Sequence, residues 1–361
     1  MRKVLMAAVV GAVAFTAGAQ EGKPAEAKPV EAAPPRPDAV DVLRREAARL
    51  VPMFENVEVR RLLVSATWLP YPDERTIYTD GKGRWLTAAE HEKLAEAERE
   101  GWRAVTFDDY RFYYTKYGSP MAYVRTLDLA AAAMPGSMSG KKVMDFGYGT
   151  IGHLRMMASR GMHAVGVDVD PMLEALYSDP EDVGSVPGAG MEDVPPAGSL
   201  TLVRGRWPKD SVEKVGGGFD LITSKNTLKN GYLNPEEKVD PRMLVDLGVS
   251  QEEFVKKVAE ALKPGGVFVI YNISPAQKPK GEGYIPWADG RCPFPREMLE
   301  QAGFEVVAYN ADDSAFARRM GVALDWDKGE RPMDLENDCF AQYTLVRKKG
   351  AAGSGAGTAK P

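Results

Sequence analysis

Residues 142–171 read KVMDFGYGTIGHLRMMASRGMHAVGVDVDP and give the clearest indication of secondary structure in the chain. An apolar run ending in Asp145 is followed by a glycine-rich turn, about two helical turns closed by Gly161, and a second apolar run ending in Asp168. This order predicts one βαβ unit. Glycines let backbone N–H groups approach a ligand, and the start of the helix adds a partial positive charge. An acid at the end of the second strand is placed to bind the hydroxyls of a ribose, so the stretch predicts a site for a nucleoside-containing cofactor.

The chain beyond this unit continues the alternation of strands and helices from residue 140 onward. This pattern predicts an α/β fold with a doubly wound, mostly parallel sheet that helices cover on both faces. Further strands are expected at residues 199–204, 219–223, 267–271, 305–309 and 340–346, and helices at residues 251–262 and 295–302. A polar insert, residues 310–338, separates the last two strands and is placed to fold over the site.

The N-terminal third predicts a separate, mainly helical cap over residues 39–139. Apolar residues at helical spacing indicate a helix over residues 40–54, and Thr87 with Glu90 forms the capping box of a second helix, residues 88–100. Between them an Asp-Gly pair at Asp80 indicates a small hairpin. A helix expected over residues 120–134 leads into the cofactor-binding domain, which we place at residues 140–348.

The two ends of the chain have a different character. Residues 1–19 carry Arg2 and Lys3, then an apolar run, then the small-residue pattern Ala17-Gly18-Ala19. These features are typical of a secretory signal peptide cut after Ala19, and they predict a secreted or periplasmic protein without a stable membrane span after cleavage. Residues 20–38 are rich in proline and alanine and predict a disordered linker, and residues 349–361 predict a flexible tail.

Charge and the scarce residues exclude several classes of function. The formal net charge is -5, which argues against nucleic acid or an anionic membrane as the main partner. Cys292 and Cys339 are the only cysteines, and they fit one disulfide or two buried thiols equally well. With only three histidines and no ligand spacing, the sequence indicates no metal site.

The glycines at 147, 149 and 152 match the dinucleotide pattern G-x-G-x-x-G, which alone is compatible with NAD. Three other features point away from it. Asp145 precedes the first glycine by two residues, and a carboxylate there can receive an ammonium group, which NAD lacks. The run Leu262-Lys-Pro-Gly-Gly266 is a tight helix-to-strand turn, and the C-terminal strands suggest an antiparallel end to the sheet.

This combination resembles the class I S-adenosylmethionine-dependent methyltransferases. The resemblance covers residues 140–347 and is carried by VMDFGYGTIG, GVDVD, FDLITSKNTL and LKPGGVFVIYN. It implies a seven-stranded Rossmann-like methyltransferase fold with S-adenosylmethionine as the cofactor. It also implies a set of cofactor-binding residues. The turn would hold the methionine end, Asp168 the ribose, Val169 the adenine and Ser224 the region of the methyl group; the full set is Asp145, Phe146, Gly147, Tyr148, Gly149, Asp168, Val169 and Ser224.

The acceptor side is less specified, because methyl transfer from a sulfonium mainly requires alignment and exclusion of water. Asn226 follows the fourth strand and would border the methyl group. Tyr114 and Tyr117 could form an aromatic lid or an acceptor pocket, or a hydrophobic seam between cap and domain. For His153 we expect packing or solvent contact rather than catalysis. Trp207, after the third strand, could stack on adenine.

Three functions remain open from the sequence. The first is an exported methyltransferase with a small-molecule or protein acceptor of unknown identity. The second is an exported non-enzymatic module with a degenerate methyltransferase fold, since the donor is made in the cytoplasm. The third is an NAD-dependent oxidoreductase, which rests on the glycine pattern alone.

Overall fold

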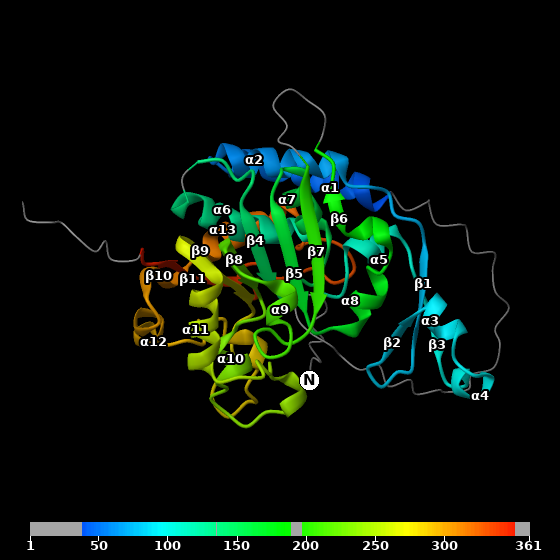
Figure 1. The fold of residues 1–361 in the computed structure, drawn as a ribbon. Helices are drawn as coiled ribbons and strands as arrows, with labels where there is room; N and C mark the ends of the chain where they lie inside the picture. The colour runs from blue at the N-terminus through cyan, green and yellow to red at the C-terminus, as the bar shows by residue number, and fades with distance from the viewer. Residues whose placement is uncertain (1–37, 135, 189–196, 351–361) are drawn as a thin grey trace, which may run out of the picture.

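A computed structural model describes residues 38–134, 136–188 and 197–350. The expected signal peptide and linker and almost the whole of the expected tail lie outside these residues. An eight-stranded sheet forms the centre of the molecule, in the order β10-β11-β9-β8-β4-β5-β7-β6 (Figure 1). Its strands are β4 (Lys142–Phe146), β5 (His163–Asp168), β6 (Gly184–Val186), β7 (Gly198–Arg204), β8 (Phe219–Lys225), β9 (Leu262–Ser274), β10 (Phe304–Asp312) and β11 (Phe340–Lys348).

The central strands are parallel and the edges are antiparallel. β4 pairs in parallel with β5 and β8, and these pair in parallel with β7 and β9. β11 runs antiparallel to both β9 and β10. The doubly wound, mostly parallel sheet with an antiparallel end is therefore confirmed. The strand number differs from the expected seven, because the short β6 adds an antiparallel edge beside β7.

Alternate residues of the central strands face two separate hydrophobic clusters. On β9, Val269 and Tyr271 belong to one cluster, while Phe268 and Ile270 belong to the other. A strand buried on both faces reads as a continuous apolar run, which explains why β9 was evident in the sequence. One face carries α6 (Val124–Ala133), α7 (Gly152–Ser159), α8 (Pro171–Leu176) and α13 (Ser314–Ala323); the other carries α9 (Val212–Val215), α11 (Gln251–Ala261) and α12 (Arg296–Gln301).

The N-terminal segment contributes helices and a second small sheet. α1 (Ala39–Leu50) and α2 (Val57–Val64) pack on the outer side of α6, α7 and α13 and share their hydrophobic cluster (Figure 1). The segment is not mainly helical throughout, because β1 (Arg75–Thr79), β2 (Trp85–Thr87) and β3 (Arg103–Phe107) form a three-stranded antiparallel sheet. The hairpin expected around Asp80 is confirmed as β1–β2. The expected helix over residues 88–100 is two short helices, α3 (Ala88–Glu92) and α4 (Glu96–Arg99), and the capping box of Thr87 and Glu90 is present.

The insert between the last two strands packs against one face of the sheet and contributes no residue to the pocket described below. Its first residues extend β10, and α13 then packs against α1 and β11. An ion pair fixes this arrangement, because the Arg125 guanidinium of α6 donates two hydrogen bonds to Asp313, at 2.9 and 2.7 Å. The expectation that the insert covers the site is therefore wrong. The apolar face of α13 instead packs into the hydrophobic core.

Both cysteines are buried and free. Of the two alternatives for Cys292 and Cys339, the structure has the two buried thiols. In the described part of the chain, no helix is long and apolar enough to cross a membrane.

A buried acid within the cap provides a test of this packing. Glu46 of α1 is 5% exposed, and its carboxylate accepts a hydrogen bond from the Ser119 hydroxyl at 2.8 Å. Burial raises the pKa of Glu46 to about 7, above its ordinary value of 4.5. Because the folded-state pKa is raised, ionisation opposes folding, and this loss of stability grows as the pH rises from about 4.5 through about 7.

At about pH 8 we expect Glu46→Gln to raise the free energy of unfolding by up to about 3 kcal/mol, and with it the melting temperature. At about pH 5 we expect little change in either quantity. The amide keeps a hydrogen-bond partner for Ser119 without the charge. Thermal unfolding of the two proteins at both pH values measures the effect. A variant less stable than the parent at about pH 8 would contradict the conclusion that ionisation of buried Glu46 opposes folding.

Candidate functional site

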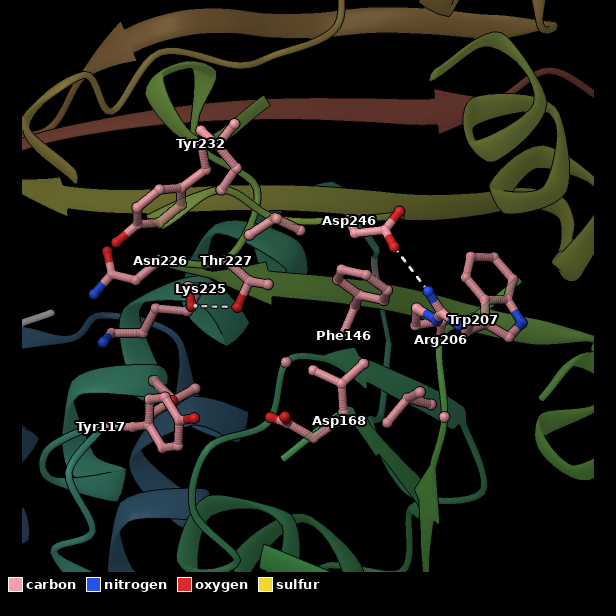
Figure 2. A pocket seen from close by; sticks show the side chains of 17 residues that line it. Tyr117, Phe146, Asp168, Arg206, Trp207, Lys225, Asn226, Thr227, Tyr232 and Asp246 are labelled. Atoms are coloured by element: carbon pink, nitrogen blue, oxygen red, sulfur yellow. Dashed lines mark hydrogen bonds and ion pairs between the residues drawn. The ribbon is translucent and has the colours of Figure 1, made fainter. Parts of the chain in front are cut away.

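A pocket opens where the parallel strands end, as the topology requires for a site in a doubly wound sheet. Its volume is about 410 Å³. We call it the strand-end pocket. The ends of β4, β5, β7 and β8 supply its floor, and the cap and the chain between β8 and α11 supply its walls. Its lining residues are Tyr117, Tyr123, Phe146, Gly147, Val167, Asp168, Val169, Gly205, Arg206, Trp207, Lys225, Asn226, Thr227, Tyr232, Leu244, Val245 and Asp246 (Figure 2).

The glycine-rich turn after β4 is packed so closely that side chains are excluded. Gly147 and Gly149 have φ values of 78° and 58°, which favour glycine. A Cβ at Gly147 would lie 2.1 Å from the Thr227 hydroxyl oxygen, and one at Gly149 would lie 2.8 Å from the Cβ of Tyr117. The turn thus exposes the Gly147 backbone to the pocket, while the cap covers Gly149.

Asp145 lies beneath the pocket with both carboxylate oxygens engaged. One oxygen is 2.7 Å from the Nε2 of His153 on α7, and the other accepts a hydrogen bond of 2.6 Å from the Thr223 hydroxyl on β8. Asp145 is 1% exposed and His153 is 2% exposed. The His153 ring also stacks on Tyr123, with 4.0 Å between ring centroids. His153 therefore packs in the core, as expected, and it also bonds to Asp145, which was not expected.

Asp168 ends β5 and faces the pocket. Its carboxylate accepts hydrogen bonds from the backbone N–H groups of Asp170, at 3.0 Å, and Gly149, at 3.3 Å. Burial raises its pKa to about 6, and the neighbouring charge of Asp170 adds to the shift. Asp170 itself caps α8 and is bonded to the Tyr117 hydroxyl and to Lys116. Asp168, rather than Asp170, is thus the carboxylate available to a ligand.

The end of β8 brings three consecutive residues to the pocket. Asn226 has a φ of 60°, which is uncommon for a residue other than glycine and ends the alternation of the strand. Its side-chain oxygen accepts a hydrogen bond of 2.7 Å from the backbone N–H of Ile273 on β9. Because of this bend, Lys225, Asn226 and Thr227 all line the pocket.

The opposite end of the pocket is apolar and closed by an ion pair. Phe146 and Trp207 meet edge to face, with 6.4 Å between their ring centroids, and Val169 is exposed beside them. The Arg206 guanidinium and the Asp246 carboxylate, 2.7 Å apart, join the end of β7 to the chain before α11 (Figure 2).

The structure brings six of the eleven residues named from the sequence to the pocket and leaves five outside it. The six are Tyr117, Phe146, Gly147, Asp168, Val169 and Asn226; the five are Tyr114, Asp145, Tyr148, Gly149 and Ser224. Tyr148 is buried beside Tyr177, and Ser224 is fully buried because the strand turns its side chain into the core. Direct binding of a ligand by Asp145 or the Gly149 backbone stays a prediction.

Tyr114 is a correction to the expected aromatic lid. Its ring stacks on Tyr110 at 4.3 Å between centroids, and its hydroxyl group lies close to Glu46 of α1. Here the alternative, a seam between cap and domain, is the observed arrangement. The helix α5 (Asp109–Tyr113) ends directly before Tyr114, whereas Tyr117 lies three residues further along the chain and lines the pocket.

Several lining residues were not named as site residues from the sequence. Lys225 lies between two residues that were named, and alternation along a strand favoured its neighbours. Tyr123, Tyr232 and residues 244–246 come from segments without a strand-end signal, and only the tertiary structure brings them to the pocket. Trp207, which was considered for adenine stacking, lines the apolar end.

No protein-family model matches the chain, and no curated protein matches its sequence. Solved structures do match. The cyclase SpnF is 15% identical, with 63% of this chain and 81% of that chain covered and a TM-score of 0.37. A phosphoethanolamine N-methyltransferase of Haemonchus contortus is 14% identical, with 69% and 62% covered and a TM-score of 0.40. A TehB-like S-adenosylmethionine-dependent methyltransferase of Corynebacterium glutamicum is 19% identical, with 63% and 88% covered and a TM-score of 0.31.

The charge pairing of Asp145 can be tested by a double-mutant cycle. We expect His153→Leu to lower the free energy of unfolding by about 3–5 kcal/mol, because it leaves a buried carboxylate with one partner fewer. The double variant Asp145→Leu/His153→Leu should be more stable than His153→Leu alone. Both variants lose the stacking on Tyr123, so their difference reports the carboxylate. Urea unfolding measures the free energies of unfolding of His153→Leu, Asp145→Leu and the double variant. If the loss in the double variant equals the sum of the losses in the two single variants, the pairing is contradicted.

Proposed function

We propose that the strand-end pocket binds S-adenosylmethionine and that this protein transfers its methyl group to an acceptor. The observation that carries the proposal is the position of Asp168. It offers a carboxylate at the end of the second parallel strand, between an apolar end and a polar end of one pocket (Figure 2). A carboxylate in this place binds the vicinal hydroxyls of a ribose, as the strand-end acid does in other nucleoside sites.

The residues of the pocket fit the parts of this donor. Phe146, Val169 and Trp207 offer an apolar surface for the adenine ring. Gly147 is partly exposed and lines the pocket, and Thr227 occupies the position that a side chain at Gly147 would take. Tyr117, Tyr123 and Tyr232 surround the other end, where aromatic faces favour a positively charged group.

The packing of the glycine turn argues against a dinucleotide. A dinucleotide places its pyrophosphate over this turn, at the start of the following helix. Here Tyr117 and Tyr123 cover Gly149, and Pro120 lies 2.8 Å from where a Cβ of Gly152 would be. The cap thus fills the pyrophosphate position, whereas a donor with a single nucleoside needs no such space.

When bound, the donor supplies an electrophilic methyl group on a positively charged sulfur. The chain binds and orients: Asp168 holds the ribose, and the bonded Asn226 keeps the end of β8 rigid beside the reacting region. The aromatic residues of the cap exclude water. An in-line displacement gains most of its rate from such alignment, so no dedicated base is required for an acceptor that is already nucleophilic.

The proposal predicts that the protein binds S-adenosylhomocysteine in calorimetry and that Asp168→Ala weakens binding tenfold to a hundredfold. The expected loss corresponds to about 1.5–3 kcal/mol, the usual contribution of hydrogen bonds to a charged group. Asp334→Ala, an exposed acid of the C-terminal insert, serves as the matched control and should bind as the parent does. Absence of binding by the parent at about 1 mM ligand would refute the donor site. Tight binding of NADH, measured by its fluorescence, would favour the oxidoreductase instead.

We further propose that the protein is exported, on the strength of residues 1–19. Mass spectrometry of protein recovered from cells should find the mature chain beginning at Gln20, after the cut that follows Ala19. The control is Ala17→Asp with Ala19→Asp, which should abolish cleavage because the small-residue pattern is lost. A mature protein that keeps Met1 would contradict export by this route.

A further inference from the structure

Lys225 is a buried lysine without a partner. It ends β8, is 5% exposed, and lines the strand-end pocket. Within the described residues its ammonium group makes no hydrogen bond and no ion pair; its one contact of note is with the Tyr123 ring, 4.5 Å from the Nζ to the centroid. Burial accordingly lowers the pKa of Lys225 to about 8. A buried charge without a counter-charge is rare, because its desolvation is compensated only by partners.

A second lysine shows what a structural role looks like in the same region. Lys229 is fully buried, and its ammonium group donates to the backbone carbonyls of Ile273 and Trp287 and to the Ser274 hydroxyl, at 2.6, 2.8 and 3.1 Å. All three of its protons are satisfied by the protein. Lys225 is also buried, at 5% exposed, but makes none of these bonds, so its ammonium group is available to a ligand that enters the pocket.

The protein's own acids do not supply the missing charge. Asp145 is the acid whose charge acts on Lys225, yet its two oxygens are held by His153 and Thr223. Asp168 lies across the pocket, where it binds backbone N–H groups and faces the ribose position. The counter-charge that fits is therefore an anionic group of a ligand.

The position of Lys225 in the pocket indicates which anionic group of the ligand it contacts. Lys225 lies beside Tyr117 at the end of the pocket away from Arg206 and Trp207, and Asp168 lies between the two ends (Figure 2). If the apolar end takes the adenine and Asp168 the ribose, the remaining part of the donor, its amino acid, extends toward Lys225. That part carries a carboxylate.

We propose that Lys225 binds the carboxylate of the donor's amino-acid part and thereby selects amino-acid-bearing nucleosides over plain ones. The inference rests on the proposed function and adds a binding residue to it. An ammonium–carboxylate pair in a buried site is strong when each ion replaces the lost hydration of the other. Two charged side chains of the pocket thus bind the donor, Asp168 at the ribose and Lys225 at the carboxylate.

Two ligands that differ only in the amino-acid part test the proposal without knowledge of the acceptor. S-adenosylhomocysteine carries the carboxylate, whereas 5′-methylthioadenosine has the same nucleoside and thioether without it. We expect Lys225→Met to weaken binding of S-adenosylhomocysteine tenfold to a hundredfold and to change the affinity for 5′-methylthioadenosine less than twofold. Lys225→Arg should restore part of the loss, since it keeps the charge. Lys256→Met, an exposed lysine of α11, is the matched control.

A second measurement keeps the test valid if Lys225→Met folds poorly. The unmodified protein should bind the carboxamide of S-adenosylhomocysteine at least tenfold more weakly than the acid. We also expect ligand-free Lys225→Met to melt at the same temperature as the parent or above it, because the variant removes an uncompensated charge. A merely structural lysine would lower the melting temperature.

Each outcome separates this inference from the proposed function. Equal losses for both ligands, or no loss for S-adenosylhomocysteine, would overturn the role of Lys225 while the donor site stands. An unchanged donor affinity would also direct attention to an acidic acceptor as the partner of Lys225. If the unmodified protein binds neither ligand, the proposed function itself fails.

Discussion

The paired carboxylate of Asp145 is the interaction on which the geometry of the pocket depends. A buried charge in a low-dielectric interior is stable only with partners, and here the partners come from different elements, His153 of α7 and Thr223 of β8. The pair therefore holds the end of β4, the start of α7 and the end of β8 in one arrangement. Through its stacking on Tyr123, His153 extends this arrangement to the cap.

The cap in turn determines what the glycine turn can bind. In an open doubly wound sheet such a turn and the following helix offer a site for phosphates. Here Thr115 donates a hydrogen bond of 2.7 Å to the Gly149 carbonyl, and Thr150 donates one of 2.7 Å to the carbonyl of Tyr113. These bonds lock the cap onto the turn, which moves the accessible space to Gly147 and Asp168. A segment far from the sheet in sequence thus narrows a general nucleotide site to a smaller ligand.

The sequence predicted the elements that follow from local pattern and missed those that follow from tertiary contact. The parallel strands were evident because strands buried on both faces are continuous apolar runs, and acids such as Asp168 were evident because they end such runs. The pairing of Asp145 with His153 was not predictable, since no local pattern reports which buried groups meet. Lys225 was missed because the left-handed Asn226 breaks the alternation on which the prediction relied.

Some buried polar groups near this site lack hydrogen-bond partners among the described residues, as do others farther away, such as the hydroxyls of Thr126 and Ser211. The Nδ1 of His153 and the hydroxyl of Ser224 are buried without hydrogen-bond partners among the described residues. His153 bonds Asp145 through its other ring nitrogen, and Ser224 directly precedes Lys225 in the chain. In contrast to Lys225, the buried charged groups of Lys229 and Asp313 are bonded to other groups of the protein. Proteins retain such uncompensated groups where function requires them, because replacing them would stabilise the fold but remove the recognition. The bonds of Asp145 fix the ends of β4 and β8, and the bonds of Thr115 and Thr150 fix the cap. The unpaired ammonium group of Lys225 lines the pocket between them.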